Sequence, residues 1–501
     1  MAPSSALSVL VKLKAVGASE VTGTFNRHTD PAGYRETVIF PTEMPVAHID
    51  ATYEFHADAN AAGPIVAVAY SSADMNEEGN GLDVVTTDGN ISSIQVPENQ
   101  KLTVGETREL MYEVKDDAGQ NIALTPGSVF WSSSDTTTLT FGNTGASGVK
   151  RGSSNVTATL DGRGSSPVEV AVTNVAKVVP IGLPNSSTPD DTSGCHVSGD
   201  GKVVYGMVSG VAFVWTKTIG VQTISEPSGF TNFIPEAVNQ DGTVAVGSAV
   251  MSNGARQAVK FILTNFNSSG GAFAALGALE GDPTFESNAT GVSADGSVIV
   301  GNSASSRGLE AFRLESGVMT GLGDFSTTDD GVSFSTAEGV SGDGSVVIGT
   351  ARLGDALYRG FRWTAGAGLE QIGAVVNPDA NDLHISATAI TRAGDVIAGY
   401  DDQTPWSWSN GVSTTLPASR FRPVAAGVEG IFGTSVENPA IMYSPTNGSV
   451  GIQALIGNLG LTAQLNGFTI SNLTDCSAQG DVVVVEANGP GSSGSFLVVL
   501  P

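Results

Sequence analysis

The sequence is poor in basic residues. Its 501 residues include 23 Lys and Arg against 50 Asp and Glu, which gives a formal net charge of −27 at pH 7. Nucleic-acid binding needs clustered Lys and Arg to neutralise phosphates, and an anionic membrane surface attracts the same residues. The composition therefore argues against nucleic acid and against an anionic membrane as partners.

Cysteine and long apolar stretches are equally scarce. Two cysteines in 501 residues exclude a disulfide-stabilised scaffold. No stretch approaches the ~20 apolar residues of a membrane-spanning helix, so we expect no membrane insertion. The first apolar run is interrupted by Lys12 and Lys14, and no basic region precedes it. Because this does not fit a secretory signal peptide, we expect synthesis in a cytoplasm without an export signal.

Glycine is abundant instead. It accounts for 63 of the 501 residues, about 13 %, which is nearly twice the usual share of about 7 %. Such a chain, also rich in Val, Thr and Ser, is typical of short strands joined by tight turns, so we expect an all-β protein. Changes in pattern divide it into three regions, residues 1–90, 91–174 and 175–501.

The first region contains a clear amphipathic strand. Polar and apolar residues alternate from position 48 to position 58, which predicts one wet face and one buried face. Adjacent polar residues, about 6.6 Å apart, could bridge a metal ion, but the whole set cannot converge on one. We therefore predict that this face docks onto a particle or onto another subunit. Its polar residues are His48, Asp50, Thr52, Glu54, His56 and Asp58.

The second region alternates short strands with turns, which predicts a β-sandwich. Its successive segments include VPENQKLTVGETREL, DDAGQ, VFWSSSD, GVKRGSSNVTATL and VEVAV. Together they resemble the bacterial immunoglobulin-like group 2 domain. The resemblance implies an immunoglobulin-like sandwich that packs around Trp131 and lacks a cysteine pair. Domains of this family occur in bacterial surface adhesins and on phage virions, usually as spacers or weak binders.

The third region is built from repeats. One phrase is a turn with Asp-Gly that runs into a Val-rich strand ending in Gly. Its copies occupy 195–206, 237–247, 291–301, 339–349 and 389–399, and degenerate copies occupy 426–435 and 475–485. Two bulky residues follow each copy and recur about every 47 residues, within the range of roughly 40–50 for propeller repeats. These pairs are Phe213/Trp215, Val259/Phe261, Phe312/Leu314, Phe361/Trp363, Trp406/Trp408, Ile441/Tyr443 and Phe496/Val498.

A third phrase, a short closing strand, ends most repeat units, with a weak copy expected at 450–457. The last unit lacks it, whereas an orphan copy at 177–183 precedes the first unit. We predict that Val178, Val179 and Ile181 complete the last unit and close a seven-bladed β-propeller without a long open edge. Cys195 and Cys476 hold near-equivalent places in the first and last units, so either a disulfide or two neighbouring buried thiols would lie at this closure.

These phrases resemble HAF repeats, a family of predicted extracellular bacterial repeats. The units 289–323 and 337–373 match best, with the form S-x-DG-x-V-V-G, then A-F-R-W, then L-G. The resemblance implies a propeller over residues 175–501. It implies no particular chemistry.

Most repeated residues have a structural explanation. The Asp-Gly steps supply one carboxylate each, whereas a calcium loop needs several oxygen ligands at short spacing, so we interpret them as hairpin turns. The bulky pairs share one strand face in every unit, so we expect them in the cores between units. Trp406 and Trp408 follow Pro405 in a short unit, and we keep them as candidate ligand contacts.

No nucleophile elbow, zinc signature or phosphate-binding loop occurs in the sequence. We therefore expect no enzyme activity, no cofactor and no metal. A glycan-degrading propeller enzyme remains a third hypothesis, because propellers host such sites.

A β module, a spacer and a broad repeat domain form the layout of a display protein. Without an export signal, the simplest route to display is assembly into a phage particle. We predict a virion structural protein on the particle surface (tail fibre, tail-associated or capsid decoration), with a bacterial surface adhesin as the alternative. Residues 1–90 would bind other virion proteins as a homo-oligomer. The acidic head would contact a glycan or protein of the host surface through stacking and hydrogen bonds rather than charge.

Overall fold

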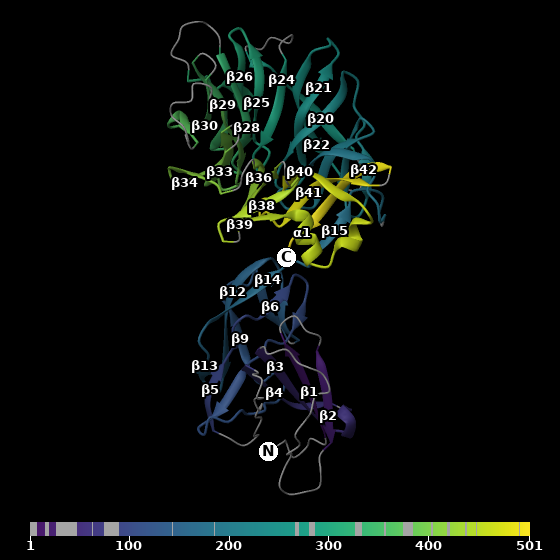
Figure 1. Cartoon of the computed structure of the whole chain (residues 1–501), viewed down its shortest axis with the longest axis vertical. Helices are drawn as coiled ribbons and strands as arrows, with labels where there is room; N and C mark the ends of the chain where they lie inside the picture. Colours follow the sequence, from purple (N-terminus) through teal and green to yellow (C-terminus); the bar gives the residue numbers. More distant parts are fainter. Residues whose placement is uncertain are drawn as a thin grey trace. The chain divides into compact units, whose positions relative to one another are not determined.

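The chain forms two compact units, Met1–Val175 and Ala176–Pro501, named here the first and second units. Nearly all of their regular structure is strand (Figure 1), so the expected all-β class is confirmed. None of the described helices is long and apolar enough to cross a bilayer. The computed structural model describes residues 8–15, 20–26, 48–62, 64–74, 90–142, 144–184, 186–265, 270–279, 286–325, 333–354, 357–373, 384–401, 404–417, 421–435, 438–446, 448–489 and 491–501.

The described residues of the first unit form four sheets. Their strand orders are β2-β1-β3-β4, β13-β12-β14-β6 with β9 paired to β12, β10-β11-β7, and β5-β8. The strands are β1 Ser8–Ala15, β2 Val21–Asn26, β3 His48–His56, β4 Ile65–Asp74, β5 Ile91–Gln95, β6 Lys101–Thr103, β7 Thr107–Arg108, β8 Glu113–Asp116, β9 Phe130–Ser133, β10 Leu139–Gly142, β11 Gly145–Gly148, β12 Gly152–Leu160, β13 Arg163–Gly164 and β14 Val168–Thr173.

One core joins the sheet β2-β1-β3-β4 to the rest of the first unit. Val68 and Tyr70 of β4 are buried in the same hydrophobic cluster as Val156 and Val170. Backbone hydrogen bonds also join Val68 to Leu124 in both directions. The predicted modules 1–90 and 91–174 are therefore packed together as one compact unit.

Trp131 lies at the side of this core. It is half-buried and stacks on Phe141, with ring centroids 5.4 Å apart. Val156 and Ala158, by contrast, are fully buried at its centre. The expectation that the core packs around Trp131 is wrong, because small and branched residues of β12 fill the middle of the unit.

The second unit consists of successive four-stranded meanders. The first six comprise β16–β19, β20–β23, β24–β27, β28–β31, β32–β35 and β36–β39, and a short parallel pairing of β26 with β28 joins two of them into one sheet. The strands are β15 Lys177–Pro180, β16 Thr192–Val197, β17 Val203–Val208, β18 Val211–Thr216, β19 Gly220–Thr223, β20 Phe230–Val238, β21 Val244–Met251, β22 Arg256–Leu263, β23 Gly271–Gly277, β24 Ser287–Val292, β25 Val298–Ser305, β26 Gly308–Glu315, β27 Val318–Gly321, β28 Ser333–Val340, β29 Val346–Gly354, β30 Leu357–Thr364, β31 Gly368–Ile372, β32 Ile385–Ile390, β33 Val396–Asp401, β34 Thr404–Ser409, β35 Val412–Thr415, β36 Arg422–Gly427, β37 Gly430–Thr434, β38 Ile441–Ser444, β39 Gly448–Gly451, β40 Thr469–Cys476, β41 Val482–Gly489 and β42 Ser492–Val499.

The first strands of these meanders form a closed circle. Contacts run in succession from β16 through β20, β24, β28, β32 and β36 to β40, and β40 contacts β16 again. The turns after these strands are joined by backbone hydrogen bonds, such as Asp200 N to Gln240 O at 2.9 Å and Gln240 N to Ala294 O at 3.1 Å. Hydrophobic cores lie between consecutive sheets, and one lies between the last sheet and the first. This closed circle of meanders is the arrangement of a β-propeller.

Strand β15 precedes the first meander in the sequence, but it belongs to the last sheet of the second unit. It pairs antiparallel with β42, in register Val178↔Val498 and Val179↔Leu497, and gives the order β15-β42-β41-β40. Figure 1 shows β15 beside the yellow strands of the chain's end. Val178 is buried on one face of this sheet, and Ile181, just beyond β15, is buried in the core toward the first sheet.

The Asp-Gly turns shape the circle. In the turn that begins at Ser293, the serine hydroxyl donates to Asp295 (2.7 Å) and accepts the N–H of Val298 (2.9 Å). A backbone N–H and two hydroxyls of the turn hold the pKa of Asp295 at about 2. Gly296 has φ 74°, and a Cβ there would lie 2.9 Å from Val244 of the preceding sheet. The hairpin interpretation is confirmed here, and the glycine also permits close packing between sheets.

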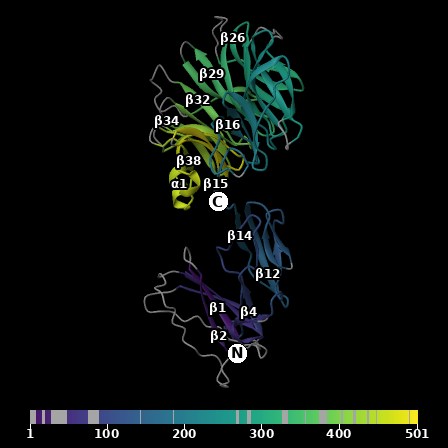
Figure 2. The ribbon, with the colours of Figure 1, turned by 90° about the vertical axis from the view of Figure 1, so that its right-hand side faces the viewer.

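One α-helix interrupts the strand pattern of the described residues. The predicted closing strand at 450–457 ends early, because β39 stops at Gly451 and helix α1 spans Ile452–Asn458. Figure 2 shows α1 beside β38. Ile452 and Ile456 are fully buried against residues of the last two sheets. Apolar residues four apart place both side chains on one helix face, which the repeat alignment did not reveal. Short 3-10 helices span Ala59–Ala61 and Thr462–Leu465.

Candidate functional site

The predicted docking face on β3 is only partly open. Thr52 and Glu54 are half-buried, Glu54 forms an ion pair with Lys12, and Asp58 is exposed. His56 is buried and lies 3.6 Å from Glu54, so its prediction as a solvated residue is wrong. β3 runs between β1 and β4, which leaves no free strand edge there. The side chains of His48 and Asp50 lie outside the described part of the structure.

The paired bulky residues lie mainly in cores. The first member of every pair is buried, including Phe213, Phe361 and Phe496 at 0 % exposure, so the core interpretation is confirmed. Trp406 is also fully buried, and its prediction as a ligand contact is wrong because it packs in the core between its own sheet and the preceding sheet. Trp408 is half-buried, with the Arg362 guanidinium 5.3 Å from its ring centroid.

The two cysteines are free and buried. Cys195 packs in the core between the last and first sheets, whereas Cys476 packs in the core between the last two sheets. The two side chains therefore lie on opposite sides of the closing sheet, which excludes the disulfide alternative in this fold. Burial raises the pKa of Cys195 to about 12, so its thiol stays protonated, and it donates to Ser495 Oγ at 3.4 Å.

A polar cluster on the inner circle of strands was not predicted. His196 of β16 lies 3.8 Å from Asp475 of β40. Burial opposes the charge of His196, but the hydrogen bond and the charges of Asp475, Glu236 and Glu486 outweigh it and raise the pKa of His196. Burial raises the pKa of Glu236 against the opposing charge of His196, and burial raises the pKa of Glu338 as well.

Arg392 reaches across this circle. It belongs to the turn after β32, and its guanidinium donates to the carbonyl of Val238 at 3.0 Å and to that of Val292 at 3.5 Å. Burial lowers its pKa, which the charge of Asp475 opposes. Its side-chain hydrogen bonds go to backbone carbonyls of two other sheets. We therefore interpret Arg392 as a structural residue that links three sheets.

The inner cluster predicts an unusual dependence of stability on pH. His196, Glu236 and Glu338 bind protons more tightly in the folded chain than in the unfolded chain, so their contribution is complete at low pH and lost as pH rises through their raised pKa values. We expect the unfolding free energy to fall between pH 5 and pH 8. Urea unfolding at both pH values tests this, and Glu338→Gln should reduce the slope. Equal or greater stability at pH 8 would contradict it.

A pocket lies where the first and last sheets of the second unit meet. It has a volume of about 600 Å³, within the size range of small-molecule sites. Strands β15 and β42 supply one wall. The rest comes from β17, β18 and the turns after β16 and β18 of the first sheet, and from the turn after β20 of the second sheet. Its lining residues are Lys177, Val179, Asp200, Gly201, Lys202, Val203, Trp215, Thr216, Lys217, Thr218, Asp241, Leu497 and Val499.

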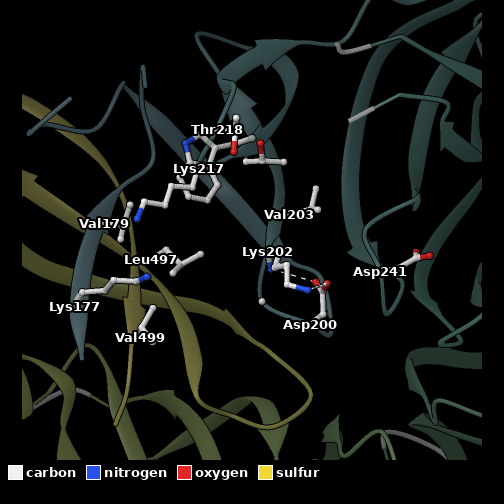
Figure 3. A pocket seen from close by; sticks show the side chains of 13 residues that line it. Lys177, Val179, Asp200, Lys202, Val203, Lys217, Thr218, Asp241, Leu497 and Val499 are labelled. Carbon is white, nitrogen blue, oxygen red and sulfur yellow. Dashed lines mark hydrogen bonds and ion pairs between the residues drawn. The ribbon is translucent and has the colours of Figure 1, made fainter. Parts of the chain in front are cut away.

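Three lysines line this pocket, in a chain with 23 basic residues in total. Lys202 forms an ion pair with Asp200 at 3.0 Å. Lys177 and Lys217 point to a common region beside Val179 (Figure 3). Burial and the neighbouring charge of Lys217 lower the pKa of Lys177. The sequence showed the scarcity of lysine, but not that these positions meet.

No three His, Cys, Asp or Glu side chains of the described residues are placed to hold a metal ion.

No family model and no curated protein matches the chain. It is similar to a solved putative TolB from Agrobacterium tumefaciens, with 15 % identity over 51 % of this chain and 94 % of that one, at a TM-score of 0.33. The Cps50 (Swd1) β-propeller domain of Myceliophteria thermophila has 12 % identity over 62 % of this chain and 97 % of that one, at 0.32. TolB from Acinetobacter baumannii has 11 % identity over 66 % and 80 %, at 0.31.

Proposed function

We propose that the chain is a phage virion structural protein displayed on the particle surface, as a tail fibre, a tail-associated protein or a capsid decoration. Residues 1–90 bind other virion proteins and assemble as a homo-oligomer. Residues 91–174 form an immunoglobulin-like spacer. The second unit is a seven-bladed propeller head of the HAF-repeat type that contacts a glycan or protein of the host surface. Recognition of a surface ligand, without catalysis, is its role.

The observation that carries the proposal is the division into two separately packed β units, of which the second is closed on itself. Pairing of β15 with β42 ties the start of that unit to its end. A core between the last and first sheets completes the circle. Such a closure resists fraying outside a cell, because the unit has no terminal sheet that can peel away alone. The excess of acidic residues also limits non-specific adhesion.

Purified particles of the phage whose genome encodes the chain provide the test. Quantitative mass spectrometry should detect the chain at a fixed ratio to the major capsid protein through successive density-gradient steps. An abundant host cytoplasmic protein serves as the control and should be depleted at each step. Complete absence from particles would reject the virion assignment, and recovery on uninfected bacterial cells would favour the adhesin instead. Release of oligosaccharides from host capsule by the full chain would favour the enzyme.

A further inference from the structure

The structure assigns the lysine pocket of the second unit as a binding site for a carboxylate-bearing sugar. This inference rests on the proposed role of the second unit as the part that contacts a surface ligand. It names the chemical class of that ligand and the residues that select it.

The charges at the pocket are the first part of the argument. Of its three lysines, Lys202 already has an acidic partner in Asp200. Within the described part of the chain, neither Lys177 nor Lys217 forms an ion pair with a carboxylate. Lys177 is half-buried and Lys217 is exposed, and burial together with the neighbouring like charge of Lys217 lowers the pKa of Lys177. An anion between the two ammonium groups would relieve the repulsion and form charge-assisted hydrogen bonds.

The walls of the pocket are the second part. Val179 of β15 and Leu497 and Val499 of β42 provide an aliphatic surface beside the lysines. Thr216 at the end of β18 and Thr218 in the turn that follows add hydroxyl groups. A pyranose ring has an apolar C–H face and a rim of hydroxyls, so it matches an aliphatic wall with flanking donors and acceptors. A carboxylate on the ring would then lie between Lys177 and Lys217 (Figure 3).

The net charge of the chain led us to expect that the head does not bind its ligand through charge, and the lysine pocket changes this expectation. A head with a large acidic excess should repel an acidic glycan at long range, but screening limits that repulsion to about 10 Å at ordinary ionic strength. Among the residues that line the pocket, the ammonium groups of Lys177, Lys202 and Lys217 outnumber the carboxylates of Asp200 and Asp241. Local charge therefore decides the selectivity, and binding should weaken as salt concentration rises.

Calorimetric titration of the full chain with the methyl glycosides of glucuronic acid and of N-acetylneuraminic acid tests the assignment. At least one of them should bind, and neutral methyl glucoside should not. Lys177→Gln and Lys217→Gln should each weaken binding about tenfold, because each removes one charge-assisted hydrogen bond. Lys150→Gln is the matched control, since Lys150 is an exposed lysine of the first unit that does not line the pocket, and it should change affinity less than about twofold. Thermal unfolding of each variant verifies that it is folded.

Several results would overturn the inference. These are no binding of either acidic sugar at 20 mM, equal binding of the neutral sugar, and affinity unaffected by Lys177→Gln and Lys217→Gln. Inorganic phosphate bound as tightly as the acidic sugars would show an unselective anion site. Lysine-dependent binding of acetyl-Val-Val with a free carboxylate, but of neither sugar, would assign the pocket to a peptide. All of these outcomes are independent of whether the chain is present in virions.

Discussion

Replacement of Trp406 by alanine should destabilise the second unit by about 4 kcal/mol. Trp406 is fully buried in a core with Ile348 of the preceding sheet and Ile397 of its own. Gly399 and Gly373 line the indole so closely that a Cβ on either would lie 2.5 and 3.2 Å from its ring atoms. Glycines have no side chain that could move into the vacated volume, so the cavity should persist.

Trp408→Ala is the matched control for this prediction. Trp408 has the same residue type on the same strand but is half-buried, so its loss should cost roughly 1 kcal/mol. Urea unfolding of both variants, followed by fluorescence and circular dichroism, measures the difference. If Trp406→Ala costs less than Trp408→Ala, the assignment of Trp406 to the core is wrong.

Gly349→Ala should destabilise the second unit by about 3 kcal/mol. Gly349 lies inside β29 at the end of the repeated phrase of its unit, where the backbone of β28 approaches closely. A Cβ at this position would lie 1.9 Å from the carbonyl oxygen of Thr336 and 2.9 Å from the ring of Phe361. Because the nearest atom belongs to backbone, the clash can be relieved only by separating the paired strands β28 and β29.

Gly354→Ala, in the same strand, controls for the general effect of adding a methyl group. A Cβ there meets nothing within 4 Å, and this glycine is not among those with positive φ. It should leave stability unchanged or raise it slightly, because alanine restricts the unfolded chain. Thermal unfolding of the two variants should therefore diverge clearly, and equal melting temperatures would contradict the explanation of the repeated glycine.

The same contact recurs in other repeat units. Gly247, Gly301, Gly399 and Gly433 would each place a Cβ within 1.9–2.1 Å of a carbonyl oxygen of the neighbouring first strand. The sheet therefore has no room for a side chain at the final glycine of the repeated phrase. Comparison of the repeats in the sequence located this glycine, and the structure gives the reason for it.

Much of the inter-sheet core could be predicted because it repeats. The bulky pairs, the Asp-Gly turns and the orphan strand at 177–183 each follow from local patterns that recur along one chain. The difference between Trp406 and Trp408 could not be predicted in this way. Both lie on one strand face, and which of them is enclosed depends on the sheet packed against that face.

The lysine pocket could not be predicted from local sequence patterns either. Lys177 and Lys217 come from segments separated by the three strands β16 to β18, and Leu497 from near the end of the chain joins them only when β15 pairs with β42. No local periodicity of the sequence indicates that these residues lie close together in the folded chain. The inner cluster of His196, Glu236 and Asp475 likewise depends on strands brought together by the circle.

The sequence by itself determined that this protein is all-β, that its larger part is a repeat of strands and Asp-Gly turns, and that bases are scarce. These properties depend on residue type and spacing, which local backbone preference translates directly into strands and turns. Only the tertiary structure decided that residues 1–90 share a core with the following region, that the cysteines lie on opposite sides of the closing sheet, and that two of the few lysines meet in one pocket. Each of these depends on contacts between segments distant in the sequence, which form because they bury apolar surface in the folded chain.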